Sequence, residues 1–84
     1  MLRDNQMYTG YVLDTNVDFI FKHWVFKYFS MQAVVRALQE LARDIGSTKF
    51  IVEVVNKNCI QYVYKTKEFN LVNKTWEENE WVKH

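Results

Sequence analysis

The chain has 84 residues and a formal net charge of +1; 49% of its residues are hydrophobic and 17% aromatic. This composition excludes a disordered chain, and the length fits one small domain, residues 1–84, with a thin margin of stability. The charge is too small to indicate nucleic-acid binding by itself. No apolar run reaches about 18 residues, and the N-terminal stretch is too polar for a signal peptide, so we expect a cytoplasmic protein without membrane spans.

The N-terminal third is predicted to be extended. Residues 1–6 are expected to fray, and a strand is expected over 6–13, where Gly10 indicates a bulge or a close neighbour. The segment 17–29 is dense in aromatic and β-branched residues, which predicts a second strand. A helix over the same segment is the alternative, because short apolar runs are ambiguous.

The clearest pattern lies between Ser30 and Gly46. Apolar residues recur there at spacings of three and four, which is the pattern of one helix face. Ser30 can cap the first turn, and Gly46 can adopt the left-handed conformation that ends a helix. We therefore predict an amphipathic helix over about 31–45, with an apolar face formed by Met31, Val34, Val35, Leu38, Leu41, Ala42 and Ile45.

Strands are predicted again after the helix. The segments 48–55 and 59–66 are separated by a polar turn, which predicts an antiparallel hairpin. Residues 68–72 are expected to add an edge strand, whereas strand and helix both remain open for residues 73–84, which we call the tail. The sequence thus predicts an α+β fold: a single antiparallel sheet of roughly 4–5 strands in the order ββαββ, with one helix on one face.

Alternation along the strands predicts which side chains meet the helix. The polar residues that mark the opposite face are Asp18, Lys22, Glu53, Gln61 and Lys65. The predicted helix-facing residues are Phe19, Phe21, Phe50, Val52, Val54, Ile60, Tyr62 and Tyr64.

The opposite face is expected to be too apolar to remain exposed to solvent. One helix cannot cover both faces of a sheet, and a contiguous exposed apolar patch typically marks an interaction surface. We favour a homodimer, and the alternatives are another protein or covering by the chain itself, through its N-terminal residues or the tail with Trp76 and Trp81. The predicted self-association or partner surface consists of Ile20, Trp24, Ile51, Val55 and Val63.

No catalytic residue is predicted. A catalytic site requires a nucleophile, a base and an orienting group, whereas His23 lies among aromatics, His84 is the last residue and Cys59 follows a turn. The same three residues lack the spacing of a metal site. We expect no enzyme activity, no metal, no cofactor and no small-molecule substrate.

Nucleic-acid binding is the alternative chemistry that the residues favour. Aromatic residues beside a basic sheet are typical of proteins that hold RNA or single-stranded DNA. A small core or a dimer interface explains the same aromatics, and we favour that explanation because the glycine-containing RNA-binding pattern is absent. The candidate nucleic-acid contacts are Lys22, Lys27, Arg36, Arg43, Lys57, Lys65 and Lys67.

The favoured function is therefore that of a non-catalytic, homodimeric binding protein that acts by occluding a macromolecular partner. Asparagine and lysine are abundant while proline and glycine are scarce, a bias typical of A/T-rich genomes. Small phage accessory proteins share this bias, so a phage-type inhibitor or counter-defence protein is our hypothesis. An RNA or single-stranded DNA binding protein is the alternative.

Overall fold

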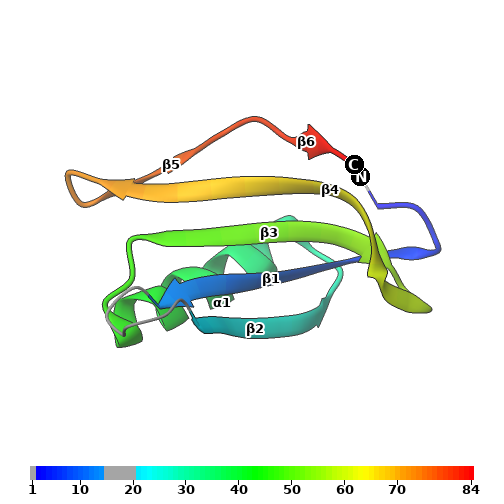
Figure 1. Cartoon of the computed structure of the whole chain (residues 1–84), viewed down its shortest axis with the longest axis horizontal. Helices are drawn as coiled ribbons and strands as arrows, with labels where there is room; N and C mark the ends of the chain where they lie inside the picture. Colours follow the sequence, from blue (N-terminus) through cyan, green and yellow to red (C-terminus); the bar gives the residue numbers. More distant parts are fainter. Residues whose placement is uncertain (1, 15–20) are drawn as a thin grey trace.

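The computed structural model describes residues 2–14 and 21–84, and within these ranges it contains one helix and a single antiparallel sheet (Figure 1). The sheet has the order β2-β1-β3-β4-β5, and β6 pairs with β4 beyond the end of β5. The elements are β1 (Gln6–Asp14), β2 (Phe21–Tyr28), α1 (Met31–Ile45), β3 (Lys49–Asn56), β4 (Cys59–Val72), β5 (Thr75–Glu78) and β6 (Val82–Lys83).

The predicted fold class is confirmed, but the predicted order ββαββ is incomplete. β4 runs without interruption to Val72, so residues 68–72 are its second half and not a separate edge strand. The tail supplies β5 and β6 instead. The chain reverses after β4 because Asn73 and Lys74 both have positive φ angles, 51° and 66°, as a two-residue hairpin turn requires.

The second predicted strand is confirmed over the part that the structure describes. Residues 21–28 form β2, so the helical alternative is wrong there. Residues 15–20, which include the predicted positions of Asp18, Phe19 and Ile20, lie outside the described residues.

The helix begins and ends where the sequence predicts. Ser30 has an extended backbone, and its hydroxyl accepts a hydrogen bond from the Ala33 N–H, which satisfies one donor of the first turn. Gly46 has a φ of 72°, and the following Ser47 N–H donates to the Ala42 carbonyl oxygen. The residues of α1 that are buried against the sheet are Val34, Leu38 and Ala42. Within the described residues, no helix is long and apolar enough to span a membrane.

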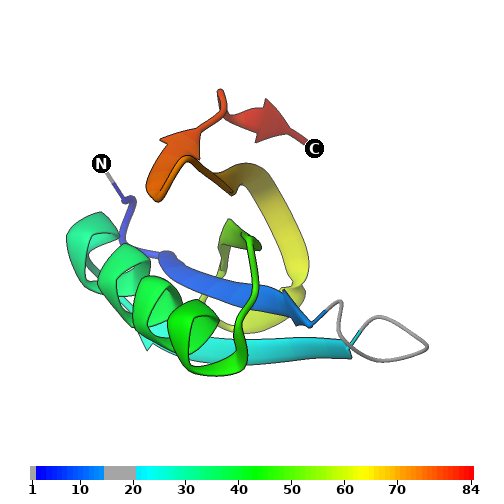
Figure 2. The same cartoon turned by 90° about the vertical axis from the view of Figure 1, so that its left-hand side faces the viewer.

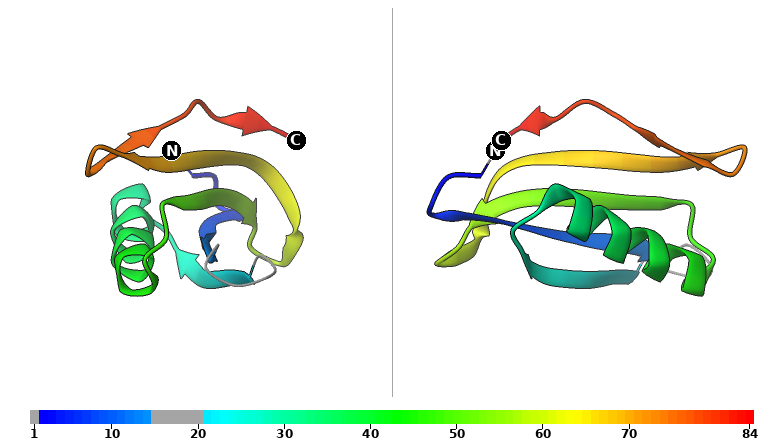
Figure 3. Two further views of the ribbon diagram at one scale, coloured as in Figure 1. Left: turned by 60° about the vertical axis from the view of Figure 1, so that its left-hand side comes forward. Right: turned by 180° about the vertical axis from the view of Figure 1, so that it is seen from behind.

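The core lies between α1 and one face of a strongly curved sheet. The backbone of α1 approaches within 8 Å of β1, β2 and β3 but not of β4, which arches away from the helix (Figures 2 and 3). Phe50 of β3 is fully buried at the centre, where its ring stacks on Phe69 at a centroid distance of 4.6 Å. Gly10 of β1 lies directly beneath Leu38, so the absence of a side chain at Gly10 lets the helix approach the sheet.

The tail covers the part of this face that α1 leaves open. The Trp76 ring lies 4.7 Å from the Phe50 ring. The ammonium groups of Lys65 and Lys67 lie 4.5 and 5.3 Å from the centre of the Trp81 ring, and Lys67 also pairs with Glu78 at 2.9 Å. The tail therefore packs on the helix side of the sheet and not on the opposite face.

Two side chains of β4 were assigned to the wrong face of the sheet, because the β3–β4 pairing is irregular. Asn56 of β3 pairs with Cys59 of β4, whereas the adjacent Val55 pairs with Val63, so β4 has extra residues between these two pairs. A second irregularity follows, because Val54 pairs with Lys65. Each such bulge reverses the alternation of side chains. Lys65 therefore lies on the helix side with the buried residue Val54, and Ile60 turns to the opposite side.

Candidate functional site

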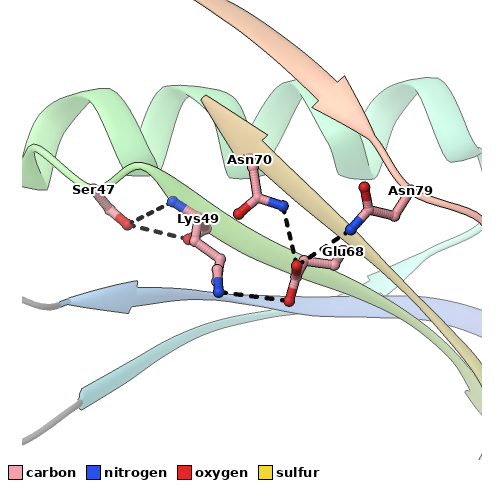
Figure 4. Close-up of polar contacts among 5 residues, drawn as sticks. All are labelled: Ser47, Lys49, Glu68, Asn70 and Asn79. Carbon is pink, nitrogen blue, oxygen red and sulfur yellow. Dashed lines mark hydrogen bonds and ion pairs between the residues drawn. The ribbon is translucent and has the colours of Figure 1, made fainter. Parts of the chain in front are cut away.

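The sheet face opposite α1 divides into a polar half and an aromatic half. In the polar half, the Lys49 ammonium lies 3.7 Å from the Glu68 carboxylate, and the side-chain amides of Asn70 and Asn79 donate to the same carboxylate (Figure 4). The backbone N–H of Lys49 donates to the hydroxyl of Ser47. The polar groups of this half therefore bind one another.

The aromatic half is a groove of about 320 Å³ between β2 and the tip of the β3–β4 hairpin. Trp24 and Phe26 form one wall, with nearly parallel rings whose centres are 5.6 Å apart. Trp24, Phe26 and Ile60 are 41–45% exposed. We call this hollow the aromatic groove; its lining residues are Thr9, Trp24, Phe26, Glu53, Ile60, Gln61 and Val63.

The predicted partner surface is only partly brought together here. Trp24 and Val63 line the aromatic groove. Ile51 lies opposite Glu68 in the polar half. Val55 is fully buried between Met7 and Val63, its neighbours in the adjacent strands, and therefore adds nothing to an exposed patch.

The floor of the aromatic groove carries a polar group that sequence reasoning missed. Thr9 is 1% exposed, and its hydroxyl has no hydrogen-bond partner among the described residues. A buried polar group without a partner costs about 1–3 kcal/mol. An occupant with a hydrogen-bonding group would relieve that cost. Threonine is common in strands, so no sequence signal distinguishes Thr9 from an ordinary strand residue.

Glu53 lies beside Thr9 on the same floor and is partly buried. Burial raises the pKa of the Glu53 carboxyl above its usual value of 4.5, and the positive charges of Lys22 and His84 oppose the rise. Burial, together with the carboxylates of Glu53 and Glu68, also raises the pKa of the Tyr11 phenol. The groove therefore disfavours an isolated negative charge on its floor.

The Glu53→Gln variant is expected to be more stable than the wild type at pH 7. A carboxyl whose pKa is raised on folding binds more protons when folded, so its contribution to stability falls as the pH rises above about 4.5. The difference in Tm between variant and wild type should therefore shrink on acidification and vanish below about pH 4.5, where Glu53 is protonated in both states. Thermal denaturation followed by circular dichroism between pH 4 and pH 8 measures this. The control is Glu80→Gln, which makes the same charge change at an exposed position; a lower Tm for Glu53→Gln at pH 7 would contradict the prediction.

The residues considered for catalysis lie apart from one another. His23 Nε2 is 3.4 Å from an Asp14 carboxylate oxygen, and His84 Nε2 is 3.0 Å from the Thr66 hydroxyl. Cys59 is an exposed free thiol after the hairpin turn. Within residues 2–14 and 21–84, no three His, Cys, Asp or Glu side chains form a group that could hold a metal ion.

The lysines predicted as nucleic-acid contacts do not form one surface. Lys65 and Lys67 are bound to Trp81 and partly buried. Lys22 is exposed, and its ammonium lies 4.7 Å from the centre of the Tyr11 ring, on the face that carries the aromatic groove. Lys27, at the end of β2, and Lys57, in the β3–β4 turn, are exposed at separate places.

Arg36 and Arg43, in contrast, line one hollow of about 690 Å³ between α1 and the β4–β5 hairpin, with Lys74 and Trp76 among the residues around it. We call this hollow the basic groove. Sequence reasoning missed Lys74 because the β4–β5 hairpin that carries it was not predicted. Comparisons with protein-family models, curated proteins and solved structures give no match for this chain.

Proposed function

We propose that the protein is a non-catalytic binding protein that forms a homodimer through the aromatic groove. The observation that supports this proposal is the grouping of Trp24, Phe26 and Ile60, each 41–45% exposed, around one hollow. Single exposed apolar side chains are normal, whereas a group of large ones beside polar residues is typical of an interaction surface. The buried hydroxyl of Thr9, which has no hydrogen-bond partner in the described part of the chain, supports an occupied groove as well.

A second copy of the chain is the occupant that the exposed area favours. Side chains of this size bury about 150–250 Å² each, so the three leave roughly 250 Å² of apolar surface per protomer. A twofold interface uses the same patch twice. The resulting burial of roughly 500 Å² is worth about 12 kcal/mol, within the range of about 4–15 kcal/mol that association costs. A weak dimer follows, which suits a regulated or transient assembly.

The Phe26→Ser variant is expected to shift the protein from dimer to monomer. The substitution removes one wall of the aromatic groove at a residue that is 45% exposed, so the fold should persist. Light scattering after size exclusion, at about 10–100 µM protein, measures the mass.

The matched control is Phe29→Ser, because Phe29 is 62% exposed and lies outside the aromatic groove. This control should remain as dimeric as the wild type, and circular dichroism should show that both variants are folded. A monomeric wild type throughout this concentration range would overturn the proposal. Equal dissociation of the two variants would do the same, since it would place the interface elsewhere.

We further propose that the dimer acts by covering a surface of a macromolecular partner, as a phage-encoded inhibitor or counter-defence accessory protein in the host cytoplasm. This part of the proposal is supported by the small size and the composition of the chain, rich in asparagine and lysine. The single cysteine of the chain, Cys59, is exposed, which suits a reducing compartment.

A single-stranded nucleic acid is the second candidate occupant of the aromatic groove. Trp24 and Phe26 present stacked rings, and the exposed Lys22 provides a cation on the same face. Glu53 on the floor opposes a nearby phosphate, so we prefer the second copy. The same light-scattering measurement, repeated with a single-stranded oligonucleotide at about 50 mM salt, distinguishes the two by the added mass.

A further inference from the structure

The basic groove lies between two elements whose backbones are apart. One side is the polar face of α1, and the other is the β4–β5 hairpin, whose strand residues all have Cα atoms more than 8 Å from those of the helix (Figure 2). The aromatic groove is lined by none of the same residues, so the two hollows are separate surfaces.

Positive charge gathers along both sides of the basic groove. Arg36 and Arg43 lie seven residues apart on α1, which separates their backbones by about 10 Å along the helix axis. Lys74 approaches from the hairpin. None of these three cations forms a salt bridge among the described residues, and Glu40 is the single carboxylate in the lining. The groove therefore carries an excess of positive charge that the described residues do not neutralise.

The same hollow also has an aromatic and apolar wall. Trp76 is partly buried, with its ring tilted by 58° against Phe50, and it lines the groove together with Leu71. An indole of this kind can stack on a flat ring such as a nucleobase, whatever the base. Cations spaced along the helix match a ligand with more than one negative group.

We propose that the basic groove binds a ligand that combines a nucleobase with two or more phosphate groups, either a free nucleoside polyphosphate or successive nucleotides of a single strand. The base lies against Trp76, and the phosphates lie between Arg36, Arg43 and Lys74. This inference goes beyond the proposed dimer and does not depend on it.

Arg36 and Arg43 each have a local role in stabilising the helix. Arg43 in the last turn complements the helix dipole, and Arg36 lies four residues from Glu40, a favourable helical spacing. Neither role accounts for Lys74 and Trp76 on the opposite side of the same hollow. A ligand that spans both sides accounts for all of them together.

Titration calorimetry with ATP, AMP and inorganic phosphate tests the proposal. The affinity should rise from phosphate to AMP, because AMP adds a base that contacts Trp76, and from AMP to ATP, because the two added phosphates reach further cations. Arg43→Gln and Lys74→Gln should each weaken ATP binding about tenfold. Glu40→Gln should strengthen it a few-fold, because the substitution removes the opposing carboxylate.

The matched control is Lys57→Gln, which removes one positive charge at an exposed turn outside the groove. Lys57→Gln should leave the ATP affinity unchanged. Phe26→Ser, which tests the dimer proposal, should also leave the ATP affinity unchanged, so the two proposals can fail independently. A single-stranded oligonucleotide forms the second arm. If it binds with the same dependence on Arg43 and Lys74 while ATP does not, a strand is the source of the phosphates. Equal losses in Lys57→Gln and Lys74→Gln, or no binding of any probe at millimolar concentration, would overturn the proposal.

Discussion

The Gly10→Ala variant is expected to lose about 2–4 kcal/mol of the free energy of unfolding. A Cβ at Gly10 would lie 2.6 Å from the Ile51 carbonyl oxygen and 2.6 Å from Leu38 Cδ1. The leucine side chain can move, but the carbonyl oxygen belongs to the neighbouring strand and is held in the sheet. Because a domain of this size is stable by only about 4–13 kcal/mol, a substantial part of its stability would be lost. Urea denaturation followed by circular dichroism gives the difference.

Two further variants separate the causes of this loss. Gly46→Ala changes the other glycine of the chain, which needs its positive φ of 72°, and should cost about 1–2 kcal/mol. Adding Leu38→Ala to Gly10→Ala removes one of the two clashes, so the alanine at position 10 should cost less in that background. Strict additivity, or a loss below about 1 kcal/mol for Gly10→Ala alone, would show that the helix does not approach the sheet as described.

The Phe50→Ala variant is expected to lose about 3–5 kcal/mol of the free energy of unfolding, a large part of the stability of a domain of this size. Phe50 is fully buried, and its ring contacts both Phe69 and Trp76. Removing the ring leaves a cavity at the place where the core of the sheet meets the β4–β5 hairpin. Urea and thermal denaturation measure the loss, and the near-ultraviolet circular dichroism should also change, because Trp76 loses its aromatic neighbour.

The matched control is Phe29→Ala, which removes the same ring from a position that is 62% exposed. Its cost should lie within about 0.5 kcal/mol. Where Phe50→Ala proves too unstable to measure, Phe50→Leu keeps most of the volume and should cost about 1.5 kcal/mol. Similar losses for the alanine variants of Phe29 and Phe50 would contradict the described core.

Features that depend on residues close together in the sequence were predicted correctly, whereas features that depend on distant residues were not. The helix was predicted with its correct bounds, because Ser30 and Gly46 act within one turn of the helix ends. In β3, one charged residue, Glu53, was enough to identify the helix-facing residues Phe50, Val52 and Val54, all of which are buried. In β4 the same reasoning misplaced Ile60 and Lys65, since the bulges depend on pairing with β3 and leave no local signal.

The candidate site was predicted less completely than the fold. Alternation along β2 placed Trp24 on the face opposite the helix, and the predicted nucleic-acid contacts included Arg36 and Arg43, which line one hollow. Thr9 and Lys74 were missed because each matters only through neighbours that are distant in the sequence. Thr9 lies on the floor of a groove only because the tip of the β3–β4 hairpin lies beside it, and Lys74 lines a groove only because α1 forms the opposite side.

The sequence by itself determined the α+β class, the helix bounds and the helix-facing residues Phe50, Val52 and Val54 of β3, since these follow from caps and periodicities over a few residues. Only the tertiary structure decided that the sheet curves, that the tail returns along β4, and that Trp24, Phe26 and Ile60 line one groove. Curvature and strand pairing arise from hydrogen bonds between residues far apart in the chain. Those contacts, and not local preference, bury Val55 and leave Trp24 and Phe26 exposed.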